Sequence, residues 1–167
     1  MMEEKKVRYD IDGSEEVTGM LRTLLNQFPG LVPGEEILFS TLGEDSGISM
    51  YPISGAVIET EKWDVVDHVT QICQYPFYLV YRAAGLSEDR KASLKEWLDT
   101  LGKWLERQPV AIDGTEHKLD KYPVLTGHRK ILSIDRQTPA YLDSVNENNS
   151  ENWAIYLTVR YQNEFDR

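Results

Sequence analysis

The feature that most restricts the fold of this chain is a run of strand-forming residues from Asp67 to Arg82. The run is rich in β-branched and aromatic residues, which favour strands, and it contains one proline, Pro76. At about 3.3 Å per residue it would span roughly 50 Å, whereas most strands have only about 5–6 residues. We therefore expect the strand either to break at Pro76 or to extend past its own domain, where its backbone and aromatic side chains would need a partner.

The length and composition are typical of a globular protein. A chain of 167 residues predicts one domain with a buried core, and 41% apolar with 28% charged residues excludes wholesale disorder. The net charge of −10 repels phosphate groups, which argues against tight nucleic-acid binding by the monomer. No signal peptide and no membrane-spanning run of about 18 apolar residues is recognisable, so we expect a protein with no membrane partner.

Two segments have the apolar spacing of amphipathic helices. Ser14 is the expected N-cap of the first helix, and Pro29–Gly30 ends it. Ser87 is the expected N-cap of the second helix, which has about 20 residues and stops at Gln108–Pro109. The residues that form one apolar face are Val17, Met20, Leu21, Leu24, Leu25 and Phe28 in the first helix, and Leu94, Trp97, Leu98, Leu101, Trp104 and Leu105 in the second.

Alternating apolar residues predict further strands. Residues 35–42 and 48–58 are expected to form a hairpin whose second strand is interrupted at Pro52 and Gly55. Further strands are expected at residues 129–136 and 153–161, whereas residues 59–67, 110–127 and 138–150 are expected to be connectors. This order predicts an α+β fold, a mostly antiparallel sheet with two helices packed on one face.

The predicted domain organisation is simple. Residues 1–13 carry no lasting apolar period and are expected to be a mobile N-terminal arm or a short edge segment. Residues 14–167 are expected to form a single α+β domain with a projecting hairpin around residues 43–75.

Pro76 is expected to mark a kink or the point where the long strand changes partner. The half from Phe77 to Arg82 is partly apolar on both faces and is expected to be a central strand. The half from Asp67 to Tyr75, with the tryptophan of the preceding polar connector, is expected to reach a neighbouring subunit. The candidate residues for this subunit or partner interface are Trp63, Asp64, Asp67, Val69, Gln71 and Tyr75.

The sequence shows no pattern that announces catalysis. Four acidic residues lie between Glu59 and Asp67, but they do not follow a calcium-loop pattern, and a solvated connector explains them as well. Cys73 is the only cysteine, which excludes an intrachain disulfide and a cysteine-rich metal site and fits folding in the cytosol. Phosphate-binding glycine loops, serine-hydrolase elbows and metal-binding histidine pairs are absent from the sequence. We therefore expect a protein that is not an enzyme, with no catalytic, metal-binding or cofactor-binding residues.

Several blocks of sequence carry a family resemblance: Tyr51–Gly55, Trp63–Val65, Gln71–Phe77, Glu96–Leu105 and Tyr156–Tyr161. Together they resemble the minor capsid proteins of phages and prophages of Gram-positive bacteria, over roughly residues 15–165. Within a phage, the size and the α+β order resemble the tail terminator. This resemblance implies a ring, usually of six copies, at the head-proximal end of the tail, which stops tube polymerisation and provides the surface for head joining.

The resemblance also implies partners and a location. The partners are further copies of the chain in a hexameric ring, the tail tube protein and the head–tail connector protein, with DNA only passing through the lumen. The location is the virion, after assembly in the host cytoplasm. Two alternatives remain: a head-completion or adaptor protein of the head–tail connector, and a small acidic binding module or enzyme with a carboxylate site at residues 59–67.

Overall fold

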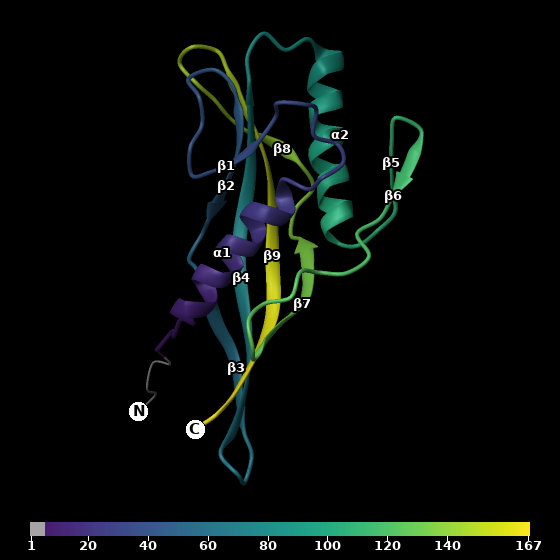
Figure 1. The fold of residues 1–167 in the computed structure, drawn as a ribbon. Coiled ribbons are helices and arrows are strands. Elements are labelled where there is room, and N and C mark those ends of the chain that lie inside the picture. The colour runs from purple at the N-terminus through teal and green to yellow at the C-terminus, as the bar shows by residue number, and fades with distance from the viewer. Residues whose placement is uncertain (1–5) are drawn as a thin grey trace.

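The computed structural model describes residues 6–167 and confirms the predicted α+β fold, in which a mostly antiparallel sheet packs both helices on one face (Figure 1). The helices are α1 (Ile11–Leu25) and α2 (Glu88–Leu105). The main sheet contains β1 (Ile37–Phe39), β2 (Gly47–Pro52), β3 (Val57–Trp63), β4 (His68–Ala83), β7 (Arg129–Arg136), β8 (Tyr141–Val145) and β9 (Glu151–Asp166). A separate two-stranded sheet contains β5 (Val110–Ile112) and β6 (Thr115–His117).

The long strand predicted around Pro76 is a single unbroken strand, β4. It pairs antiparallel with β9 along its whole length, with Pro76 opposite Thr158, so the predicted alternative of a break or kink at Pro76 is wrong. The other alternative, a change of partner, is confirmed. On its other edge, β4 pairs with β3 before Pro76 and with β2 after it.

Proline is tolerated at this point because the neighbouring strand is interrupted there. The backbone N–H of Ile53 donates to the carbonyl oxygen of Pro76 at 3.0 Å. In an antiparallel strand the nitrogen and the carbonyl of one residue point to the same side. The nitrogen of Pro76, which has no hydrogen, therefore points into the gap between β2 and β3, where no strand requires a donor.

The core lies between the helices and one face of the sheet. Alternate residues of β4 are buried on that face, and the same face continues through Pro76. The side chains that meet there from β4 and β9 include Cys73, Tyr75, Phe77, Leu79, Ile155, Leu157, Val159 and Tyr161. Both helices contribute the apolar faces that their sequence spacing predicts, so this prediction is confirmed.

The start of α1 differs from the prediction. Its N-cap is Asp10, whose carboxylate accepts a hydrogen bond from the backbone N–H of Gly13, and the helix begins at Ile11. The predicted cap, Ser14, lies inside the helix, and its hydroxyl instead accepts from the backbone N–H of Ala56. The cap prediction is therefore wrong, because Asp10 precedes the apolar face by one more helical turn and satisfies the same free amides.

The N-terminal segment also differs from a mobile arm over the residues that the structure describes. Tyr9 forms an isolated bridge with Val57, and the N–H of Asp10 donates to the carbonyl of Ala56. These contacts match the alternative prediction, a short edge segment, which here lies beside the start of β3. Residues 1–5 of the expected arm lie outside the described residues.

The predicted hairpin of residues 35–42 and 48–58 is wrong. β1 and β2 pair in parallel. The segment that connects them crosses back, so that β2 begins at the same end of the sheet as β1. The true hairpin is formed by β3 and β4, so much of the predicted connector 59–67 is strand. The predicted connectors 110–127 and 138–150 likewise contain the β5–β6 hairpin and β8, since pairing partners elsewhere in the fold stabilise strands that lack a clear apolar alternation.

Candidate functional site

The turn of the β3–β4 hairpin lies at one end of the molecule, beyond the helices (Figure 1). The Asp64 carboxylate holds the turn by accepting from the N–H groups of Val66 at 2.9 Å and His68 at 3.0 Å. Asp67 adopts a left-handed backbone with φ of 60°, which aspartate tolerates better than most residues. We call residues 63–67 the hairpin tip.

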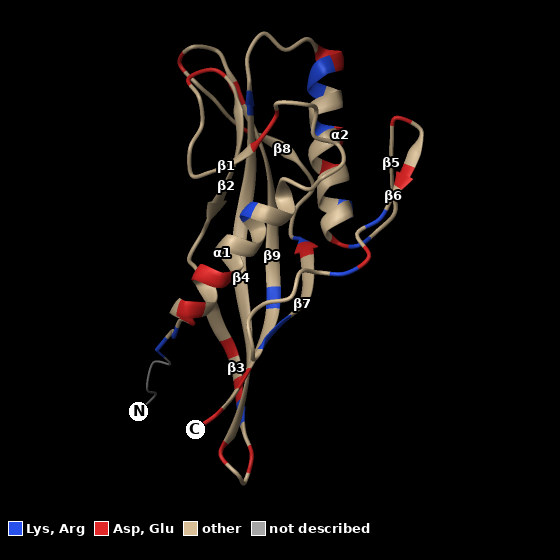
Figure 2. Ribbon diagram, viewed as in Figure 1, with Lys and Arg blue, Asp and Glu red and all other residues tan. Residues whose placement is uncertain are grey.

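The hairpin tip exposes apolar side chains in a fixed geometry. Val65 is 102% exposed and Val66 is 75% exposed, although turns usually carry polar residues. The aspartates Asp64 and Asp67 flank these valines, and Figure 2 shows acidic residues on both sides of the turn. The tip therefore presents a small apolar centre with a negatively charged rim.

The C-terminal end of β9 supports the hairpin tip. The guanidinium of Arg167 lies 3.9 Å from the ring centroid of Trp63, and the N–H of Arg167 donates to the carbonyl of Asp67 at 3.0 Å. His68 Nδ1 lies 2.9 Å from Asp166 Oδ1, and this hydrogen bond raises the pKa of His68 above its usual value. The tip is thus tied to the sheet at both of its ends.

The six predicted interface residues divide into two groups. Trp63, Asp64 and Asp67 lie in the hairpin tip, where Trp63 is 44% exposed. Val69, Gln71 and Tyr75 are buried within the chain itself, on the face of β4 that the helices cover. The last three residues offer no surface in the isolated chain, because the period-two face to which the sequence assigns them is the core face.

The acidic residues of segment 59–67 do not converge on one site. Glu59 accepts from Gln74 on the sheet face opposite the helices, whereas Glu61 accepts from Gln71 on the helix side. The pairing of β3 with β4 shifts register between Ile58 and Thr60, so Glu59 and Glu61 face opposite sides of the sheet although they are two residues apart, and they cannot share a ligand. Within residues 6–167, no group of three or more acidic, histidine or cysteine side chains is placed to hold a metal ion.

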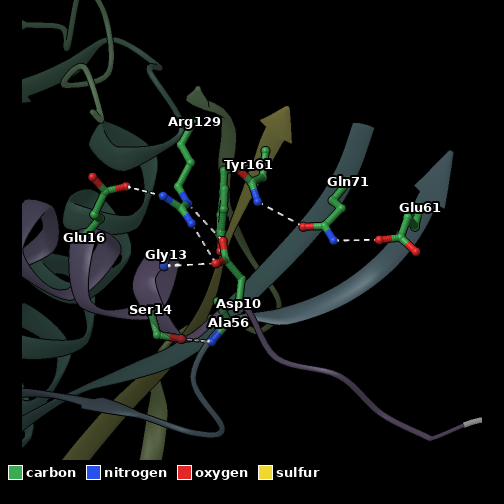
Figure 3. A network of polar contacts seen from close by, with 10 residues as sticks. Asp10, Gly13, Ser14, Glu16, Ala56, Glu61, Gln71, Arg129 and Tyr161 are labelled. Atoms are coloured by element: carbon green, nitrogen blue, oxygen red, sulfur yellow. Dashed lines mark hydrogen bonds and ion pairs between the residues drawn. The ribbon is translucent and has the colours of Figure 1, made fainter. Parts of the chain in front are cut away.

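A buried polar network joins α1 to β7 and β9 (Figure 3). The Asp10 carboxylate accepts from Arg129 Nη2 at 2.8 Å, from the hydroxyl of Tyr161 at 2.7 Å and from Gly13 N at 3.1 Å. A second carboxylate, that of Glu16, accepts from Arg129 Nη1 at 3.2 Å. The network therefore fixes the start of α1 on the sheet.

The protonation states in this network follow from burial and hydrogen bonding. Burial alone would raise the pKa of Asp10, but the bonds from Arg129, Tyr161 and Gly13 outweigh it and lower that pKa below its usual value. Burial, with the bond to Asp10, raises the pKa of Tyr161, so its hydroxyl stays protonated. The network is saturated with internal partners and has a structural role.

Sequence reasoning missed this network, although one signal for it was present. Asp10 stands in a sequence, Asp-Ile-Asp-Gly-Ser, that offers three candidate caps, and only the fold shows which of them meets Arg129.

The single cysteine lies near this network. Burial raises the pKa of Cys73 to about 11, so its thiol remains protonated and is a poor nucleophile. The cysteine therefore supports no catalytic role.

The sheet face opposite the helices carries a row of tyrosines. The row crosses four strands, and the ring centroids of neighbouring tyrosines along it lie 5.4 Å, 5.5 Å and 6.1 Å apart. The row consists of Tyr51 on β2, Tyr78 on β4, Tyr156 on β9 and Tyr141 on β8. Two of the three pairs are stacked, with interplanar angles of 15° and 19°, so the rings pack against one another and leave part of each exposed.

Comparison with other proteins adds no assignment to this geometry. Among the described residues, neither helix combines the length and the apolar composition that are needed to cross a membrane. The chain matches no known family model and no curated protein sequence.

Proposed function

We propose that this chain is a structural subunit of a phage virion, a tail terminator that forms a ring, usually of six copies, at the head-proximal end of the tail. In this role it stops polymerisation of the tail tube and joins the head. Its partners are other copies of itself, the tail tube protein and the head–tail connector protein, with DNA passing through the lumen.

The observation that carries this proposal is the hairpin tip. Val65 and Val66 are exposed in a turn that hydrogen bonds hold in one conformation, and they contribute nothing to the core. Apolar side chains fixed in this way lose little conformational freedom when they bind, which favours a protein–protein contact. The tip is thus better suited to assembly than to binding a small polar ligand.

Two further features support assembly. The row of tyrosines leaves a partly exposed aromatic surface on the face opposite the helices, and tyrosine is enriched at protein interfaces. Closed rings need two different patches on each subunit, and the hairpin tip and the tyrosine row are different patches. The net charge of −10 is compatible with DNA that slides through a lumen without binding.

The test is an assembly experiment with purified protein and purified tail tubes. Native mass spectrometry should detect a closed ring, and electron microscopy should show the protein at one end of each tube, which then stops growing. Protein that stays monomeric with and without tubes, and never caps them, would contradict the proposal.

Electron micrographs of virions that lack the protein distinguish a tail terminator from a head-completion or adaptor protein. A tail terminator predicts abnormally long tails that are not joined to heads. Tails of normal length with unstable heads would instead identify a head-completion or adaptor protein.

A further inference from the structure

The hairpin tip is complementary to a surface that is apolar at its centre and positively charged at its edge. Val65 and Val66 supply the apolar centre of the tip, and the carboxylates of Asp64 and Asp67 supply its rim. The hydrogen bonds from two backbone N–H groups lower the pKa of Asp64, which therefore stays ionised at neutral pH.

A groove of this kind exists at the opposite end of the same chain. It has a volume of about 210 Å³ and lies between the upper end of β4 and the first half of α2. Its apolar wall is formed by Leu86, Leu94, Trp97 and Tyr81, and Arg90 is its one charged lining residue. Arg90 makes no ion pair with any residue of segment 6–167.

The apolar wall of this groove is preformed. The rings of Tyr81 and Trp97 meet edge to face, with centroids 5.3 Å apart. Trp97 Nε1 donates to the carbonyl of Gly30 at 3.0 Å, and the Tyr81 hydroxyl donates to Glu35 at 3.2 Å. Both aromatic side chains are therefore already held in place before a partner arrives.

Other grooves on the described surface carry at least one carboxylate and fit an acidic tip less well; two of them combine Arg22 with Glu36 or with Glu15. A groove of about 750 Å³ adjoins the groove of about 210 Å³ and shares Tyr81, Ala83 and Arg90 with it. Its charged lining residues are two arginines, Arg82 and Arg90, and three carboxylates, those of Glu35, Glu36 and Asp45, so carboxylates predominate there. A groove of about 400 Å³ between α1 and residues 123–126 carries Glu16 as its one charged residue. Carboxylates in these walls would repel the rim of the hairpin tip.

We infer that the hairpin tip of one copy inserts into the Arg90 groove of the next copy. Val65 and Val66 then pack against Trp97 and Leu94, and the rim carboxylates face the guanidinium of Arg90. The tip and the groove lie at opposite ends of the molecule, so one copy cannot make this contact with itself (Figure 1). The contact is head-to-tail, and a head-to-tail contact gives a closed ring when the rotation between successive copies closes. It rests on the proposed function, whose subunit contact it specifies.

Disulfide cross-linking tests this contact directly. Ser93 lines the groove and is exposed, so the double variant Val65→Cys, Ser93→Cys should form disulfides between copies under mild oxidation. The expected product is a ladder of linked oligomers that ends at the ring size. The matched control replaces Val65→Cys by Val145→Cys, an exposed valine on β8, and should give no ladder. Cys73 is buried and should not contribute to cross-linking.

Charge reversal provides a second readout. Arg90→Glu should raise the concentration needed for half-maximal assembly by about tenfold or more, whereas Lys103→Glu, the same charge change elsewhere on α2, should leave it unchanged. Equal assembly of both variants, or no ladder from the double-cysteine variant, would overturn the inference.

The outcomes separate this inference from the proposed function. Protein that caps tail tubes but gives no cross-link would retain the function and remove this interface. Protein that cross-links into a ladder but never caps tubes would retain the interface and remove the tail-terminator role.

Discussion

The hydroxyl of Tyr161 donates a hydrogen bond of 2.7 Å to the carboxylate of Asp10, residues that lie at opposite ends of the chain. The same carboxylate caps α1 and pairs with Arg129 on β7. One side chain thus connects the first helix to two strands formed much later in the sequence. Since the ion pair is buried, the loss of Asp10 leaves Arg129 with the carboxylate of Glu16 as its remaining ion-pair partner, at 3.2 Å.

Replacing Asp10 should therefore destabilise the fold strongly. Asp10→Asn keeps the shape of the side chain but removes one of the two carboxylates that pair with Arg129, and the expected loss in the free energy of unfolding is roughly 2 kcal/mol at neutral pH. Urea denaturation at pH 7 measures it. Asp12→Asn, at an exposed acid in the same helical turn, is the control and should cost less than about 0.5 kcal/mol.

The difference in the free energy of unfolding between wild type and Asp10→Asn should depend on pH in one direction. The folded pKa of Asp10 lies below its ordinary value of 3.8, so its stabilising contribution is present above that value and is lost as the pH falls through the folded pKa. The stability gap between wild type and Asp10→Asn should accordingly stay constant from pH 7 to about pH 5 and shrink below about pH 4. A gap that does not change with pH would contradict the charged role of Asp10.

Glycine substitutions in α1 should have opposite effects at two positions. A methyl group at Gly13 would collide with the Asp10 carboxylate and the Tyr161 hydroxyl, so Gly13→Ala should lower the free energy of unfolding by more than about 1 kcal/mol. A methyl group at Gly19 would meet no atom within 4 Å beyond the neighbouring backbone of its own helix, so Gly19→Ala should raise the free energy of unfolding by up to about 1 kcal/mol. Thermal unfolding of both variants is the measurement, and equal effects would contradict the packing described around Gly13.

The C-terminal support of the hairpin tip can be followed through His68. Its hydrogen bond to Asp166 raises its pKa above the ordinary value of 6.5, since the protonated ring binds the carboxylate more tightly. An NMR titration should give a His68 midpoint above 6.5 in the wild type and closer to 6.5 in Asp166→Asn. The matched control is Asp120→Asn, at an exposed aspartate that is not a partner of His68, and it should leave the His68 midpoint at its wild-type value.

The fold class was predictable because its signals are local. The apolar spacing of both helices and the alternation in β4, β7 and β9 each depend on neighbouring residues only. The parallel pairing of β1 with β2 was not predictable in this way, since a three-residue strand carries too little alternation to specify its direction. Pro76 shows the same limit, because its effect depends on whether the neighbouring strand continues beside it.

The candidate site was predictable only in part, for a related reason. Trp63, Asp64 and Asp67 are polar-flanked residues of a turn, and the structure places them in the exposed hairpin tip. For Val69 and Gln71, the sequence gives the shared face but not which face the helices cover. The Arg90 groove lies between α2 and the end of β4, and the sequence alone does not show which of their residues line it together.

The hairpin tip should tolerate polar substitution without loss of stability while losing assembly. Val65 and Val66 are exposed, so the double variant Val65→Ser, Val66→Ser should keep the free energy of unfolding within about 0.5 kcal/mol of wild type. The same variant should abolish ring formation in native mass spectrometry, because it removes the apolar centre of the tip. Val145→Ser, an exposed valine outside the tip, is the control and should assemble normally. If the double variant forms rings as readily as the wild type, the hairpin tip is not an assembly surface; if it unfolds, the two valines contribute to the fold in a way that their exposure does not show.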